Sequence, residues 1–232
     1  MKSLCALFGP VIFICCLGLT SQAQEKLRCP RSIATIGNSV MAEASKGTLL
    51  RVYDDLGCHI ILEELPGRRG IASFNNSIVD GEMYRLRIVE PRYTRKFVRS
   101  AVPIFLVSGS LWRRPNSKGD DNLPTGHVFG IVWQEKYMEG RRGKVFNTVE
   151  EAFKSYEVGE INSFLASDFA VRHRISEDGF SIVPDQGERL MEAPIYHYLG
   201  EEFTPFMNFF SSYIKKHSPF ALMEITDEIQ GG

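Results

Sequence analysis

The sequence predicts an α/β protein made of two similar lobes, each a mainly parallel sheet flanked by helices. Short apolar strands alternate with amphipathic helices along the chain, which favours parallel strands joined by helical crossovers. The succession of helix, polar turn and strand over residues 69–83 also recurs over residues 151–165. Because any α/β chain alternates helix and strand, chance repetition within one domain is the alternative to two lobes.

The first half of the chain shows the alternation clearly. Residues 32–37 form a short apolar strand that ends at a glycine. Residues 49–57 place apolar side chains at helical spacing and also end at a glycine, so they predict a helix. A strand over residues 58–65 stops at Pro66 and Gly67, which interrupt regular structure. The half closes with a helix over residues 68–75 and a strand over residues 78–86.

The second half repeats this order. Thr148, with Glu151 three residues later, forms a capping box that opens a helix over residues 149–158. A polar, turn-rich loop over residues 113–122 separates the two halves. The other expected elements are a strand and turn over 126–133, a short helix over 134–138 and a strand over 161–166.

The last expected element is an amphipathic helix over residues 201–216. Its apolar side chains recur at helical spacing, which is typical of a helix that packs on a core rather than of a ligand site. They are Phe203, Phe206, Phe209, Phe210, Tyr213 and Ile214.

The amino-terminal residues predict export. Lys2 precedes an apolar run over residues 4–17, and small residues follow at 21–23, an order typical of a secretory signal peptide cleaved after Ala23. The run is short for a membrane-spanning helix. We therefore expect a periplasmic mature protein that starts at Gln24 and has no stable membrane insertion.

The composition argues against two classes of protein. The 27 basic and 28 acidic residues give a net charge of −1, which argues against a nucleic-acid partner. Hydrophobic residues make up 44% of the 232-residue chain, enough for a real core and too many for a disordered protein. We expect a folded monomer.

The cysteines predict one disulfide. Cys29 and Cys58 are the two that follow the predicted signal peptide, in a chain bound for an oxidising compartment. A bridge between them would contribute about 3.5 kcal/mol on the chain-entropy model, and two unlinked cysteines are the alternative. The histidines are scattered without metal-ligand spacing, so we expect neither a metal nor another cofactor.

Four stretches resemble a known family. They are residues 53–57 (YDDLG), 64–69 (ELPGRR), 79–82 (VDGE) and 193–199 (APIYHYL). These stretches are similar to those of bacterial extracytoplasmic solute-binding proteins, and in particular of type II periplasmic binding proteins related to polar amino-acid receptors (bacterial family 3). The resemblance implies a two-segment hinge between the lobes and a small-molecule solute in the cleft between them.

The resemblance also implies how the chain divides. After the signal peptide (1–23), residues 24–103 would form lobe one, residues 104–191 lobe two, and residues 192–232 a return to lobe one with the C-terminal helix. The outgoing crossing would lie near residues 102–104, and the return near 192–194.

This sequence departs from the family pattern in two places. The loop after the first strand, which often carries ligand-stacking aromatic residues in relatives, is here residues 37–41 (GNSVM). The lobe-two aspartate that often binds a ligand amino group aligns with Ser167, while Asp168 stands one place further on. A slip of one residue turns a strand side chain to the opposite face. Both departures weaken the case for an ordinary amino acid as the solute.

Basic residues supply the first candidate ligand groups. Residues 85–99 contain five arginines and one lysine against a single acid, and guanidinium groups bind carboxylates bidentately. Arg85 is the leading candidate because it follows Asp80 and Glu82 at the open end of a predicted strand. Arg92, Arg69 and Glu82 are further candidates. A solvated basic surface is the alternative for most of the segment, and Asp80 is expected to fix the strand-end turn.

Lobe two supplies the remaining candidates. Gly130 precedes a predicted helix, so its backbone N–H is placed to hold an anion. Trp133 is placed to stack on a solute, with a hinge or core role as the alternative. Asp168 would accept from a ligand cation, or else serve as a plain helix cap.

These observations predict a solute-binding protein for uptake by an ABC-type transporter. The solute would be small, polar, carboxylate-bearing and amino-acid-like, and the partner an ABC permease. The alternative is an orphan or sensory module that reports to a membrane sensor. An enzyme is not expected: Glu82 and Asp168 would have to form a carboxylate pair for a lyase or hydrolase, as in a few members of this fold, and we predict no catalytic residue.

Overall fold

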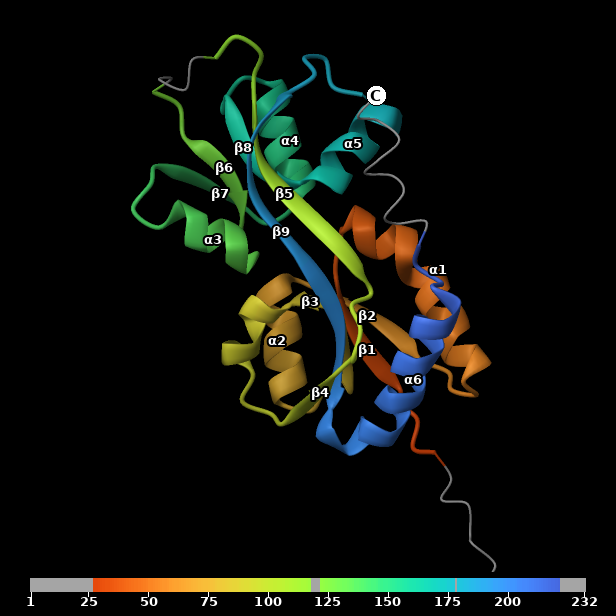
Figure 1. Cartoon of the computed structure of the whole chain (residues 1–232). Coiled ribbons are helices and arrows are strands. Elements are labelled where there is room, and N and C mark those ends of the chain that lie inside the picture. The colour runs from red at the N-terminus through yellow and green to blue at the C-terminus, as the bar shows by residue number, and fades with distance from the viewer. Residues whose placement is uncertain (1–26, 118–121, 178, 222–232) are drawn as a thin grey trace, which may run out of the picture.

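The structure, a computed structural model, describes residues 27–117, 122–177 and 179–221 (Figure 1). The predicted signal peptide lies outside the described residues. Among the helices of these ranges, none combines the length and the hydrophobicity that a membrane span requires. The strands of these ranges form one nine-stranded sheet that extends through both lobes.

Lobe one is built on three parallel strands in the order β2-β1-β3. They are β1 (Ser32–Ile36), β2 (Ile61–Leu65) and β3 (Gly81–Leu86), joined by helices α1 (Val40–Asp55) and α2 (Gly67–Asn75). Parallel neighbours need a crossover connection, and the two helices supply it. The predicted alternation of strand and helix is confirmed here.

Lobe two repeats the arrangement with parallel strands in the order β8-β6-β7. Its elements are β6 (Thr125–Val128), α3 (Val132–Met138), β7 (Gly143–Phe146), α4 (Val149–Glu157), β8 (Ser163–Ser167) and α5 (Asp168–Glu177). Thr148 caps α4 as predicted, since its Oγ1 accepts from the Glu151 N–H at 3.2 Å. The Glu151 carboxylate accepts from the Asn147 N–H, one residue before the cap.

Two long antiparallel strands join the lobes, β5 (Phe105–Arg113) and β9 (Asp185–Gly200). They run side by side through the middle of the molecule (Figure 1). Beyond β5, the carboxyl half of β9 pairs with β3 and with the short β4 (Phe97–Arg99) of lobe one. The predicted crossings lie next to this ladder, where the Ile104 N–H donates to the Ile195 carbonyl at 2.9 Å. The lobe boundaries themselves stay a prediction.

Two helices differ in extent from the sequence expectation. α1 begins at Val40 rather than at residue 49, because the Ser39 hydroxyl caps it by accepting from the Ala42 N–H at 3.3 Å. Its first two turns (VMAEASK) place their apolar residues next to one another and end in polar residues, so hydrophobic spacing did not reveal them. At the other end of the chain, α6 (Thr204–His217) follows a 3₁₀ turn, η2 (Glu201–Phe203), and Pro205 occupies its first turn, a position where a missing N–H costs nothing.

The aromatic stripe of α6 lies in the core of lobe one, as predicted. Phe206 and Phe210 are fully buried and contact Tyr53 of α1. The ring centroid of Tyr53 lies 4.8 Å from that of Phe206 and 5.8 Å from that of Phe210. Phe209 is the exception in this stripe, with 58% of its surface exposed. Lobe two has a separate core in which Phe153 and Tyr156 of α4 pack on Phe164 of β8.

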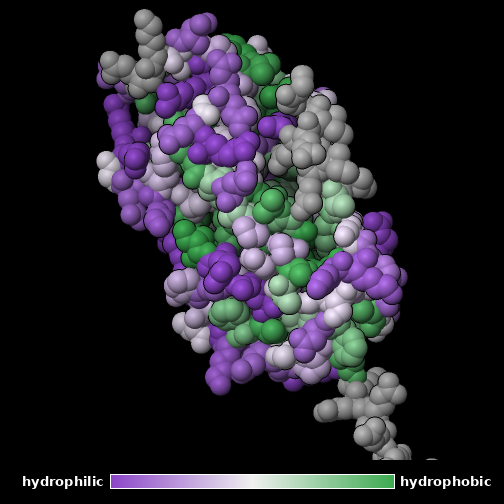
Figure 2. Space-filling view, viewed as in Figure 1, coloured by the Kyte–Doolittle hydropathy of each residue, from purple (hydrophilic) through white to green (hydrophobic). Residues whose placement is uncertain are grey.

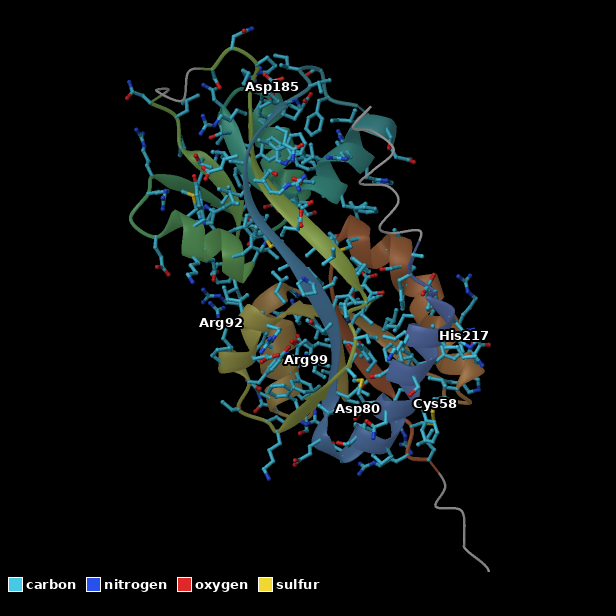
Figure 3. All side chains as sticks on the ribbon, viewed as in Figure 1. Cys58, Asp80, Arg92, Arg99, Asp185 and His217 are labelled. Carbon is cyan, nitrogen blue, oxygen red and sulfur yellow. A yellow bond between two sulfur atoms is a disulfide. The ribbon has the colours of Figure 1, made fainter. Side chains whose placement is uncertain are left out.

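The predicted disulfide between Cys29 and Cys58 is present, with 5.5 Å between the two Cα atoms. Each cysteine precedes one of the parallel neighbours β1 and β2. Asp80 closes the same end of the sheet, because its Oδ2 accepts from the Arg31 N–H at 2.6 Å and the Ser32 N–H at 3.2 Å (Figure 3). Asp80 thus has the structural role expected for it.

His197 of β9 is a fully buried histidine in lobe one. Its Nδ1 lies 3.0 and 3.1 Å from the carbonyl oxygens of Glu82 and Met83, and carbonyls only accept, so Nδ1 carries the proton. Its Nε2, 2.6 Å from the Tyr53 hydroxyl, then accepts from it. Burial lowers the pKa of His197 from 6.5 to about 4, although the two carbonyls act in the opposite direction.

We expect the free energy of unfolding to fall by up to about 3 kcal/mol as the pH drops from 6.5 to 4. The unfolded chain binds a proton at this histidine in that range and the folded chain does not, so acid favours unfolding. Urea denaturation at several pH values would measure the effect. The His197→Gln variant should lack this component, whereas His173→Gln, at an exposed position, should keep it. If the free energy of unfolding of wild type and of His197→Gln falls equally as the pH drops, the prediction is contradicted.

Candidate functional site

A cavity of about 200 Å³ lies between the two lobes. The ends of β1, β3, β6 and β8 line it, together with the first turns of α1 and α3. The carboxyl ends of the parallel strands of both lobes therefore converge on one space, which is the usual place for a ligand in open α/β sheets.

The wall of this cavity is mainly apolar. Ile36 and Met41 from lobe one, Val107 of β5 and Phe129 and Trp133 from lobe two contribute to it. Hydrophobic residues are also visible at the waist between the lobes in the space-filling view (Figure 2). Among the described residues that line the cavity, Arg85 is the one charged side chain.

Arg85, the leading sequence candidate, reaches the cavity as half of a buried ion pair. Its side chain is 6% exposed, and its Nη2 donates to Glu82 Oε1 at 2.6 Å and to the Gly67 carbonyl at 3.2 Å. Its Nε is buried without a hydrogen-bond partner in the described part of the chain. Gly70 of α2 makes room for the pair, because a Cβ there would lie 2.8 Å from Arg85 Nη2. One donor of the guanidinium therefore has no acceptor among the described residues.

Glu82, another candidate, lies behind Arg85 and is not part of the cavity wall. It is fully buried, and its second oxygen accepts from the Tyr93 hydroxyl. Burial, followed by the charge of Glu82, raises the pKa of Tyr93 well above its usual value, so the hydroxyl stays protonated and donates. Both oxygens of Glu82 are thus occupied, and this residue positions Arg85.

A second ion cluster ties the two lobes together at the rim of the cavity. Glu135 of α3 accepts at Oε1 from Arg68 Nη2 of α2 at 2.9 Å and from the Gly130 N–H at 2.8 Å. Its Oε2 lies 3.4 Å from Arg92 Nη2, at the end of the 3₁₀ helix η1 (Arg87–Arg92) in lobe one. Partial burial raises the pKa of Glu135, but the Gly130 N–H and the two arginines outweigh it and the pKa is lowered.

This cluster accounts for two further candidates. Arg92 lies at the edge of the molecule between α2 and α3, where its guanidinium binds Glu135 rather than lining the cavity (Figure 3). Gly130 does line the cavity, but its N–H is occupied by Glu135. The sequence patterns did not single out Glu135 or Arg68. An acid in the first turn of the short helix after Gly130 is the one local signal, and it does not name its partners.

The remaining candidates take different places. Trp133 lines the cavity and packs on Gly109 of β5, where a Cβ would lie 2.8 Å from the indole ring. Arg69 is exposed on α2, outside the wall. Asp168 is fully buried away from the cavity, where its Oδ2 accepts from Gln186 Nε2 at 3.0 Å. Ser167, the last residue of β8, lines the cavity instead.

The described residues contain no group of three or more His, Cys, Asp or Glu side chains arranged to hold a metal ion. The site that they do form is a partly open, mainly apolar space with one arginine at its wall and an ion cluster at its rim. Such an arrangement can bind a small molecule and orient an acceptor group on it.

Comparison with proteins of known structure identifies the fold. No family model and no curated protein matches the sequence. Solved structures do match, including the arginine-bound Gly52Ala mutant of ArgBP from T. maritima, with a TM-score of 0.65, 11% identity and coverage of 80% of this chain and 94% of that one.

Two further matches have similar statistics. The GluR0 ligand-binding core from Nostoc punctiforme in complex with L-glutamate has a TM-score of 0.64 and 15% identity, over 83% of this chain and 96% of that one. The probable amino-acid ABC transporter extracellular-binding protein ytmK from Bacillus subtilis has a TM-score of 0.61 and 13% identity, over 87% and 97%. With two parallel-stranded lobes joined by β5 and β9, this chain has the two-lobed fold of the type II periplasmic binding proteins.

Proposed function

We propose that this protein is an exported solute-binding protein that captures a small carboxylate-bearing solute between its lobes for uptake by an ABC-type transporter. The observation that carries the proposal is the cavity at the lobe interface, whose wall contains Arg85 as its one charged side chain among the described residues. The matched proteins from T. maritima and Nostoc punctiforme hold arginine and L-glutamate, which supports a small solute for a protein of this fold. The Bacillus subtilis match supports the link to ABC uptake.

Capture needs the lobes to close and no covalent step. β5 and β9 are the two connections about which the lobes would move, and the contacts of Glu135 with Arg68 and Arg92 would form as the cleft closes. A hydrolase or lyase would need a free acid or base at the cavity. The two carboxylates suggested for that role, Glu82 and Asp168, lie outside the wall, where Glu82 binds Arg85 and Tyr93 and one oxygen of Asp168 accepts from Gln186.

A thermal-shift screen of amino acids, small organic acids, sugars and oligopeptides tests the proposal. A solute that binds only the folded state raises the melting temperature. The Arg85→Lys variant keeps a positive charge beside Glu82 but lacks the Nε donor, so it should bind the solute about 2 kcal/mol more weakly. Arg99→Lys, in which the replaced arginine pairs with Glu90 outside the cavity, should bind like wild type. A screen without any binding solute would contradict the function.

A further inference from the structure

The chemistry of the cavity wall distinguishes between kinds of carboxylate. An α-amino acid carries an ammonium group that must be desolvated along with its carboxylate. Burying an unpaired ammonium is costly, so a site for amino acids needs an acid at the wall. No Asp or Glu is among the described residues that line this cavity.

The nearby acids do not supply that partner. Glu82 is fully occupied by Arg85 and Tyr93, and Glu135 by Arg68, Arg92 and the Gly130 N–H. Ser167 stands at the wall of lobe two, and its hydroxyl already accepts from the Ala170 N–H at 3.3 Å. The adjoining outer groove does carry carboxylates, at Glu43, Glu64, Glu150 and Glu151, but these side chains line that open groove and not the cavity.

The charges around the cavity, in contrast, favour an anion. Arg85 is balanced by Glu82, but at the rim of the cavity Arg68 and Arg92 share the single carboxylate of Glu135, so the rim carries one surplus positive charge. Arg85 Nε and Thr35 Oγ1 are buried and have no hydrogen-bond partner among the described residues, and both residues belong to the wall. One solute carboxylate would offset the surplus positive charge.

The volume and the apolar wall define the rest of the solute. An apolar protein cavity of about 150 Å³ binds benzene, so the space of about 200 Å³ suits a molecule of roughly six to ten non-hydrogen atoms. Ile36, Val107 and Met191 would contact an apolar body, and Trp133 offers a ring face to it.

We infer that the solute is a small monocarboxylate with a compact apolar body and no ammonium group, rather than an α-amino acid. This inference rests on the proposed function and specifies the solute class of the same cavity. It departs from the polar, amino-acid-like solute that the sequence suggested, because the wall offers apolar side chains and an arginine but no acid.

Matched ligand pairs test the inference by calorimetry on the mature protein at pH 7. Leucine is compared with 4-methylpentanoate and 4-methyl-2-oxopentanoate, and valine with 3-methylbutanoate, so that members of a pair share a body and differ at the amino group. We expect the acid without an ammonium group to bind at least tenfold more tightly than its amino-acid partner.

The outcomes separate the inference from the function. Equal or tighter binding of the amino acid overturns the inference and leaves the function standing. If another class of solute binds and no member of either pair does, the inference is also overturned and the function also stands. No binding by any solute, in these pairs or in the wider screen, overturns the function and the inference together.

A variant of Ser167 supplies an independent test. Ser167→Asp keeps a residue that can cap α5 and adds the missing carboxylate to the wall. It should reverse the preference, with at least a tenfold loss of affinity for the acid and a gain for the amino acid. Ser176→Asp, at an exposed position near the other end of α5, adds the same charge away from the cavity and should leave the preference unchanged. An unaltered preference in Ser167→Asp overturns the inference.

Discussion

Replacing Glu82 with alanine is expected to lower the free energy of unfolding by about 3–5 kcal/mol, the cost of leaving one charge of a buried pair uncompensated. Glu82 and Arg85 are 1% and 6% exposed at their side chains, so water cannot take the place of the lost carboxylate. The change also removes the acceptor of the Tyr93 hydroxyl.

Urea denaturation of matched variants would measure this effect. Glu43→Ala removes the acid of an exposed helix pair with Lys46 and should cost at most about 1 kcal/mol. The double variant Glu82→Met/Arg85→Met should recover much of the loss, because it removes both charges and fills the space with apolar atoms. A cost below that of Glu43→Ala would show that the pair is not buried as described.

Reducing the disulfide should lower the free energy of unfolding by about 3.5 kcal/mol, because opening the loop between Cys29 and Cys58 releases conformational entropy in the unfolded chain. The two cysteines are 29 residues apart in the sequence, and the loop contains all of β1 and α1. The bridge also holds the starts of two neighbouring parallel strands together.

Denaturation curves with and without reductant would show the loss. The variant Cys29→Ala/Cys58→Ala should have the stability of the reduced protein and be insensitive to reductant, which separates loss of the bridge from other effects of the reagent. Thiols that can be alkylated in the native, unreduced protein would contradict the prediction.

Local patterns in the sequence sufficed to predict many features of both lobes. The helices around residues 68–75 and 149–158, the cap at Thr148 and the bridge between Cys29 and Cys58 depend on neighbouring residues or on a simple pairing rule. Arg85 could be selected because the carboxyl end of a predicted strand is where a cleft forms. Its place at the cavity wall agrees with that argument, and its role as a ligand group stays a prediction.

The periodicity of side chains and the pairing of cysteines are properties of short segments, and they were enough to predict the α/β alternation, the two similar lobes and the disulfide. The surroundings of the cavity, by contrast, depend on contacts between segments that are distant in the sequence. Glu135 lies 67 residues from Arg68 and 43 from Arg92, yet its carboxylate binds both. Arg85 is already paired with Glu82, and the turn into α5 directs Asp168 away from the wall. Such contacts join segments from both lobes, and their partners depend on how β5 and β9 set the lobes together, which no local pattern encodes.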